Sequence, residues 1–256
     1  MKRLLLACTL LGISTQTSWA SLAASDLITR ARTLLKDGSS ATNRQQFSDA
    51  QYLSWASDGQ REANAQNWLL VTSTTFALFG GTTEYAMPAD FLFPVRVWYQ
   101  QVGQPMTKLP ATSFNDLDAK SPGWYNVTGT PINYYVDEST STAYLGFYPA
   151  PTAVSTGPVI VYYLQSTVDL SASNESALPF NSWTIMQPYV SALPYYMAYR
   201  GYLTLEEVEL AKEYLSFWTT FLLVMRQGIN RQPDFNPPGA ALRSGNPTGM
   251  GGVGGY

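Results

Sequence analysis

Hydrophobic positions repeat with a helical period near both ends of the chain and with a period of two between them. The first helical segment is predicted over residues 25–36, with Ser25 as its N-cap and Gly38 just beyond its end. Its apolar residues share one face: Leu27, Ile28, Ala31, Leu34 and Leu35. A surface helix that covers a core has this pattern.

A second helix is predicted over residues 48–70. Ser48 and Gln51 have the spacing of a capping box, in which the serine hydroxyl accepts a hydrogen bond from the backbone of the third helical residue. Phe47 and Tyr52 lie on either side of this cap and have the spacing of a hydrophobic staple. The two signals together fix where the second helix begins.

From Val71 the apolar residues alternate, which predicts a mostly antiparallel sandwich or barrel of six or seven strands. The glycine pair Gly80-Gly81 predicts a hairpin turn between strands at 74–78 and 83–86. Ser113 is expected to cap a brief helical turn. The other strands are predicted at 93–100, 106–109, 132–136, 143–148 and 159–164.

The helical period returns after a polar connection that follows the last strand. Ser182 is expected to cap a helix that Pro188 and Pro194 kink or break. Thr204 has the spacing of a capping box for a final amphipathic helix, which ends near Gly228. From Gln232 the chain is rich in proline, glycine and asparagine, a composition that cannot bury a core of its own.

These patterns predict an α+β fold. Two N-terminal and two C-terminal helices form a helical base, with a mostly antiparallel β module inserted between them and an extended C-terminal arm after them. The expected divisions are 1–24, a signal-like segment or arm; 25–70 and 166–228, the two halves of the helical base; 71–165, the β module; and 229–256, the arm.

Composition narrows the classes of function. Charged residues make up 13% of the chain, against about 25% in ordinary soluble domains, while Tyr (17) and Trp (7) are plentiful. Such a surface suits contact with other proteins, although a carbohydrate-binding protein has a similar composition. The net charge of −3 provides no general basic field for nucleic acid. The absence of histidine excludes Ser-His-Asp and Cys-His catalysis, and Cys8 alone cannot form an internal disulfide.

The first twenty residues admit two interpretations. Lys2-Arg3, the apolar run from Leu4 to Ile13 and the small residues of Ser18-Trp19-Ala20 have the layout of a secretory signal. The alternative is an arm that docks on a neighbouring subunit. The apolar run is too short to span a bilayer.

The stretch from Gly80 to Gln100 carries a resemblance to a known family. Its run Glu84-Tyr85-Ala86-Met87-Pro88-Ala89-Asp90-Phe91, followed by an aromatic strand, resembles the head-to-tail adaptor (connector) proteins of tailed bacteriophages, with methionine where leucine is commoner. The family-motif positions are Glu84, Tyr85, Pro88, Asp90 and Phe91. Further phrases occur in the family's order: Phe47 to Leu53, Ser57 to Glu62, and Thr128-Gly129-Thr130-Pro131. The resemblance covers residues 25–227.

The resemblance implies a virion structural protein with no enzymatic activity and no cofactor or metal. It implies a dodecameric ring of this chain that joins the portal protein to a tail or nozzle protein. DNA would pass through the lumen without sequence-specific binding, no membrane would be involved, and assembly would take place in the host cytoplasm. The expected portal-binding arm includes Pro237, Pro238, Gly239, Gly249, Gly251, Gly252 and Tyr256. The expected subunit interface includes Tyr195, Tyr196, Tyr199, Trp218, Phe221, Tyr52 and Trp55.

Two other classes remain open from the residues alone. The first is a secreted or periplasmic carbohydrate-binding or envelope-associated protein, whose sugar-stacking groove would draw on Trp98, Tyr99, Trp124, Tyr125, Tyr134 and Tyr148. The second is a hydrolase that works through two carboxylates, for instance Asp90 and Asp137. No spacing in the sequence singles out that pair.

Overall fold

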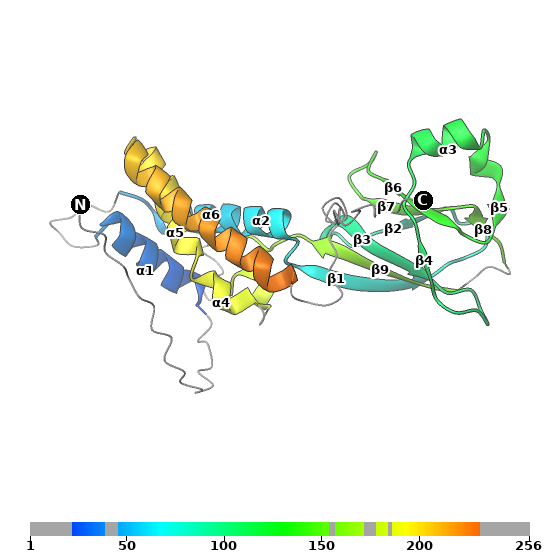
Figure 1. The fold of residues 1–256 in the computed structure, drawn as a ribbon, viewed down its shortest axis with the longest axis horizontal. Coiled ribbons are helices and arrows are strands. Elements are labelled where there is room, and N and C mark those ends of the chain that lie inside the picture. The colour runs from blue at the N-terminus through cyan, green and yellow to red at the C-terminus, as the bar shows by residue number, and fades with distance from the viewer. Residues whose placement is uncertain (1–21, 39–45, 154–156, 172–177, 184–185, 231–256) are drawn as a thin grey trace, which may run out of the picture.

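Helices gather at one end of the elongated molecule and strands at the other, as the computed structural model in Figure 1 shows. The structure describes residues 22–38, 46–153, 157–171, 178–183 and 186–230. We call the helices at the first end the helical base and the strands at the other end, with their connections, the β module. The signal-like segment lies outside the described residues.

The helical base is built from two helices near the start of the chain and three near its end. They are α1 (Ala24–Leu35), α2 (Asp49–Asn67), α4 (Gln187–Val190), α5 (Leu193–Thr204) and α6 (Val208–Asn230). A 3-10 turn, η3 (Phe180–Ser182), precedes α4. Helix α5 packs against α1, α2 and α6, so it lies at the centre of the base. One hydrophobic core joins all of these helices, with Tyr52, Phe180 and Trp218 fully enclosed.

In the described part of the chain the β module contains three sheets, and the two larger ones share one core. The larger sheet has the order β1 (Val71–Ala77), β9 (Pro158–Gln165), β3 (Phe91–Tyr99), β4 (Thr107–Leu109). The smaller has the order β2 (Glu84–Ala86), β7 (Tyr144–Tyr148), β6 (Asn133–Asp137), and β5 (Thr128–Gly129) pairs with β8 (Ala150–Pro151). The short helix α3 (Phe114–Lys120) and the 3-10 turn η1 (Trp124–Asn126) connect β4 to β5. All pairs except β5 with β8 are antiparallel, so the predicted α+β fold is confirmed.

The predicted start of the second helix is confirmed in detail. The Ser48 side chain accepts a hydrogen bond from the Gln51 backbone N–H, and the Phe47 and Tyr52 rings meet edge to face at 6.0 Å. The predicted cap of the first helix is wrong, because α1 begins at Ala24 and Ser25 lies inside it. The Asp26 carboxylate takes over the capping role by accepting a hydrogen bond from the Ala23 N–H.

The predicted hairpin around Gly80-Gly81 is also wrong. Strand β1 pairs with β9 and strand β2 pairs with β7, so the two glycines carry the chain from one sheet to the other. The Phe76 and Tyr85 rings stack at 5.1 Å within the shared core. Packing the two partly buried rings against the shared core is the physical alternative to pairing the two backbones side by side.

The returning helices α4 and α5 each have a proline near their start, so the predicted break between them is confirmed. Pro188 and Pro194 each lie in the first turn of a separate helix, α4 and α5, where the missing N–H costs nothing. Ser182 ends the 3-10 turn and does not cap a helix. Thr204 does not cap α6 either, because its hydroxyl donates to the Arg200 carbonyl within α5. The corner between α5 and α6 turns at Glu206, which has a φ of 62°.

A buried polar face of α2 holds the connection between the β module and the returning helices. Ser57 accepts from the Leu170 N–H at 2.9 Å. Gln60 donates to the Val168 carbonyl at 2.6 Å and accepts from the Phe180 N–H at 2.9 Å. One turn further along, Asn64 donates to the Gln165 carbonyl at 2.7 Å. The described residues of the connection have little secondary structure to pair their backbone groups. The side chains of α2 therefore form hydrogen bonds to the backbone N–H and C=O groups that the connection buries.

Candidate assembly surfaces

The stretch with the family phrase joins the two sheets of the β module. Tyr85 of β2 accepts a hydrogen bond from the Phe79 N–H at 2.7 Å through its hydroxyl. Glu84 accepts from the Tyr135 hydroxyl at 3.3 Å, and burial together with this carboxylate raises the pKa of Tyr135. Pro88 begins a tight turn that the Phe91 N–H closes on the Pro88 carbonyl. The phrase therefore has a structural role within the fold.

Asp90 anchors the same stretch to the last strand. Its side chain accepts a hydrogen bond from the Tyr163 hydroxyl at 3.1 Å, and its backbone carbonyl accepts from the Ser166 N–H at 2.7 Å. Burial, with a smaller contribution from Asp90, raises the pKa of Tyr163 to about 12. The buried Phe91 ring lies 5.4 Å from the Tyr163 ring. These contacts fix the end of β9 where the chain leaves the β module for the base.

Helix α6 carries two apolar stripes along its length. The inner stripe faces the core of the base and contains Ala211, Leu215, Trp218, Leu222 and Met225. The outer stripe is displaced by one residue and contains Leu210, Tyr214, Phe217, Phe221 and Val224. Both stripes follow intervals of four and three residues, so each forms a continuous line on the helix. A helix with two such lines has an apolar surface wider than its own core uses.

The outer stripe is open to solvent over much of its length. Leu210 is 37% exposed, Phe217 45% and Val224 49%. Tyr195 of α5 borders the stripe, with its ring 5.6 Å from the Phe217 ring and 5.5 Å from the Phe221 ring. In Figure 1, α6 (orange) lies across α5 on the outside of the base. This aromatic surface is a candidate contact with another protein chain.

The residues predicted for a subunit interface fall into two groups. Four of them are buried in the core of this chain itself: Tyr52, Trp55, Tyr196 and Trp218. Trp218 is 0% exposed and lies against the Tyr196 ring at 5.1 Å. The four side chains therefore offer no surface to a second subunit in this conformation. Tyr195, Tyr199 and Phe221 are half-buried, and an interface role for them stays a prediction.

The sequence analysis missed part of the exposed surface of α6. The prediction of a final amphipathic helix assigned it one apolar face and did not separate a second stripe. The nearly continuous apolar run from Phe217 to Met225 was the available signal, because one buried face cannot accommodate it. The residues predicted for the portal-binding arm, from Pro237 to Tyr256, lie outside the described part of the chain.

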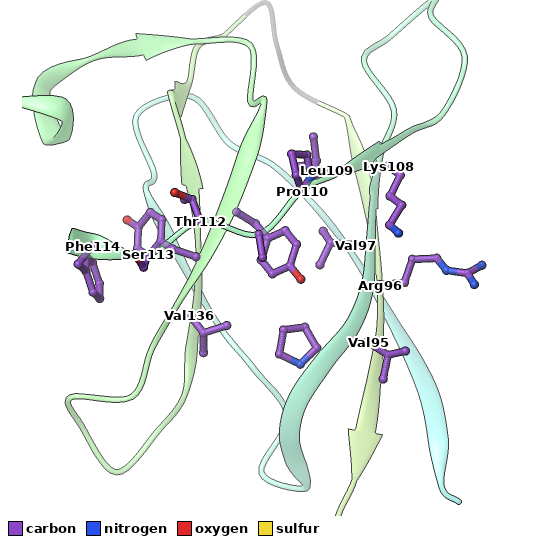
Figure 2. A pocket seen from close by; sticks show the side chains of 14 residues that line it. Val95, Arg96, Val97, Lys108, Leu109, Pro110, Thr112, Ser113, Phe114 and Val136 are labelled. Atoms are coloured by element: carbon purple, nitrogen blue, oxygen red, sulfur yellow. The ribbon is translucent and has the colours of Figure 1, made fainter. Parts of the chain in front are cut away.

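A cleft of about 740 Å³ separates β3 and β4 of the larger sheet from β6 and α3. Pro94, Val97, Leu109 and Val136 give it a largely apolar lining. In Figure 2 the charged ends of Arg96 and Lys108 point away from the other lining residues, to the opposite side of their strands. The cleft therefore lacks an evident charged group aimed at a ligand.

The proposed sugar-stacking groove does not form as one surface. Tyr99 and Tyr134 are buried in the core of the β module, while Trp98 lies on the opposite face of β3 from Tyr99. Trp124 meets the Tyr135 and Tyr148 rings edge to face. Tyr125 is 66% exposed, so the six rings are divided between the core, opposite faces of a strand and the surface, and they do not line one groove.

The carboxylates named for a hydrolase have local partners. Asp90 accepts from Tyr163, and Asp137 accepts from the Ser139 N–H at 2.8 Å, which lowers the pKa of Asp137. Within the described ranges no three Asp, Glu or Cys residues come together as a metal site. Among the described helices none is long and apolar enough to cross a bilayer.

Comparison with known families identifies the chain. The model of the family described as SU10 adaptor protein matches residues 22–241, which includes the whole helical base and the whole β module. The chain belongs to this family. It is a phage head-to-tail adaptor, a class of virion structural proteins that is not generally enzymatic. A search of curated proteins found no match to the chain. The recognition drawn from the Glu84 to Phe91 phrase is thereby confirmed.

Proposed function

We propose that this SU10-type adaptor forms a ring between the capsid portal and the tail and continues the channel through which DNA passes. The observation that carries the proposal is the outer stripe of α6. Three residues of this stripe are among the exposed large hydrophobic residues of the described chain: Leu210, Phe217 and Val224. An exposed apolar surface on a structural protein of this family is best explained by contact with a further protein chain.

A ring accounts for this surface because subunits related by rotation bury it repeatedly. Each subunit presents one face to the preceding subunit and a different face to the following one, and the rotation closes the set. We propose dodecameric symmetry, matching the portal, with the portal protein on one side and a tail or nozzle protein on the other. The acidic balance of the chain, a net charge of −3, suits a lumen that lets DNA pass without specific binding.

The divisions at 1–24, 25–70, 71–165, 166–228 and 229–256 form part of the proposal. In this arrangement the helical bases stand side by side, the β module points towards the tail, and the C-terminal arm runs along the portal. The arm residues are Pro237, Pro238, Gly239, Gly249, Gly251, Gly252 and Tyr256. Assembly takes place in the host cytoplasm.

Native mass spectrometry with and without the portal protein of the same virus tests this function. We expect the 28.2 kDa chain to be monomeric alone and to join portal rings one to one. A chain that does not bind the portal, or that has lost the mass of a signal peptide, would overturn the proposal and favour a secreted carbohydrate-binding or envelope-associated protein. Deleting residues 239–256 tests the arm separately, because unchanged portal affinity of the shortened chain would remove the arm from the proposal.

A further inference from the structure

The proposed ring requires a second surface that accepts the outer stripe of α6, and the exposed face of α1 has the right composition for it. Thr29 and Thr33 lie on this face. Their hydroxyls donate to the carbonyls of Ser25 and Thr29, at 3.1 and 2.9 Å. Because these donors are already satisfied inside the helix, covering the face strands no polar hydrogen and leaves the threonine methyl groups for apolar contact.

Basic side chains lie beside the threonines of α1, together with Asp26, whose carboxylate accepts from the Ala23 N–H, and acidic side chains lie near the outer stripe of α6. Arg30 and Lys36 border the threonines of α1, both are exposed, and no described residue forms an ion pair with either. Glu213 precedes Phe217 of the outer stripe by four residues within α6, so it lies beside the stripe, and Glu206 lies at the corner just before α6 begins. Both glutamates are exposed. Opposite charges beside two surfaces that meet favour one partner and one orientation.

The two surfaces also agree in length and in height. Helix α1 has 12 residues, which makes it about 18 Å long, and the outer stripe from Leu210 to Val224 extends over about 21 Å. The Tyr202 hydroxyl donates to the Leu34 carbonyl at 2.9 Å, so the end of α1 lies near the corner where α6 begins. Lys36 and Glu206 therefore lie at the same end of the base, and neighbours standing side by side present them at one level.

We infer that the outer stripe of α6 in one subunit binds the exposed face of α1 in the next subunit, with Glu206 and Glu213 beside Arg30 and Lys36. The contact is heterologous, since α1 and α6 are different surfaces on the same subunit. Both helices pack on α5 and are not extensively packed on each other, so each remains accessible to a different neighbour. The inference rests on the proposed ring and names the two surfaces that form it.

Disulfide trapping in portal-bound assemblies tests the inference. Cys8→Ser first removes the native thiol, and Thr33→Cys and Leu210→Cys, which lie at one level when Lys36 is level with Glu206, are then made as separate chains and together in one chain. After oxidation, a mixture of the two single variants should give a covalent dimer, and the double variant a ladder of multimers. Leu223→Cys is the matched control, because Leu223 is exposed on α6 but lies on another side of the helix from the outer stripe. Paired with Thr33→Cys, it should give no dimer.

The outcomes separate the inference from the proposed function. Portal-bound rings that form without a Thr33–Leu210 cross-link would overturn the pairing of α1 with α6 and leave the ring intact. Covalent dimers of the Leu210→Cys chain alone would replace it with a symmetric contact between two α6 helices. Native mass spectra without any ring on the portal would overturn both proposals.

A charge exchange provides a second and independent test. Glu213→Lys should raise the subunit concentration needed for ring assembly about threefold, the size expected for one exposed ion pair. Adding Arg30→Glu to the same chain should restore assembly, because every interface then carries the pair in reversed order. Lys212→Glu, at an exposed position beside Glu213 whose partner Glu209 is in its own helix, is the control that should not be rescued by Arg30→Glu. Equal effects of Arg30→Glu in both backgrounds would contradict the inference.

Discussion

The hydroxyl of Tyr52 donates a hydrogen bond of 2.8 Å to the fully buried carboxylate of Asp37. The same carboxylate forms an ion pair with Arg32 at 3.2 Å and accepts a hydrogen bond from the backbone N–H of Gln46 at 2.7 Å. Burial and this carboxylate raise the pKa of Tyr52. A charged group inside the base is stable only because each of these partners is present, so the site joins the end of α1 to the start of α2.

Asp37→Asn should lower the free energy of unfolding by about 2–4 kcal/mol, because it leaves the largely buried Arg32 without its enclosed partner. Asp49→Asn is the control, since Asp49 binds the same arginine at 2.6 Å but is 50% exposed. That control should cost less than about 1 kcal/mol. Urea unfolding followed by tryptophan fluorescence measures both values. Equal costs would show that burial of Asp37 does not matter.

Gln60→Leu should destabilise the chain by about 2–4 kcal/mol, because it removes the partners of the Val168 carbonyl and the Phe180 N–H at once. Gln60 is 0% exposed, so water cannot replace those two hydrogen bonds. Gln66→Leu, at an exposed position on the same helix, should change stability by less than about 1 kcal/mol. Amide hydrogen exchange should rise at residues 165–170 in the first variant only, and unchanged protection there would refute the role of α2.

Stability should fall as the pH rises above 10, the ordinary pKa of tyrosine. The pKa of Tyr163 in the folded chain is about 12, so the folded state keeps a proton that the unfolded state loses. The contribution is therefore complete below pH 10 and lost by pH 12, at on the order of 2 kcal/mol. Tyr163→Phe should show a shallower decline over this interval than the parent chain, measured by urea unfolding at several pH values. Parallel curves would contradict the assignment.

Gly146→Ala should destabilise the β module by about 2–3 kcal/mol, the range for overpacking a closed core. A Cβ atom at Gly146 would overlap the ring of Tyr135, which is only 2% exposed and cannot move outward freely. Gly129→Ala is the matched control, because its nearest neighbour would be a Pro149 side-chain atom at 3.4 Å. The melting temperatures of the two variants test this prediction. A Gly146→Ala chain as stable as Gly129→Ala would show that the Tyr135 ring moves to make room for the added methyl group.

The sequence by itself determined the order of the helical and β segments and the start of some helices, whereas the predicted caps at Ser25, Ser182 and Thr204 were wrong. Caps at Ser48 and Ser113 are short-range contacts, and the structure has both. Pro188 and Pro194 break the returning helix because a proline acts on its own turn. The phrase from Glu84 to Phe91 identified the family, which the match over residues 22–241 confirms.

Only the tertiary structure decided which of these elements meet. Two strands separated by a glycine turn have the pattern of a hairpin, yet β1 and β2 join different sheets, and the partly buried Phe76 and Tyr85 rings stack against the shared core. Likewise, Trp218 and Phe217 are neighbours in sequence, and only the packing of α6 on α5 places one at 0% and the other at 45% exposure. A periodic pattern specifies a face of an element, whereas the partner of that face depends on contacts between residues far apart in the chain.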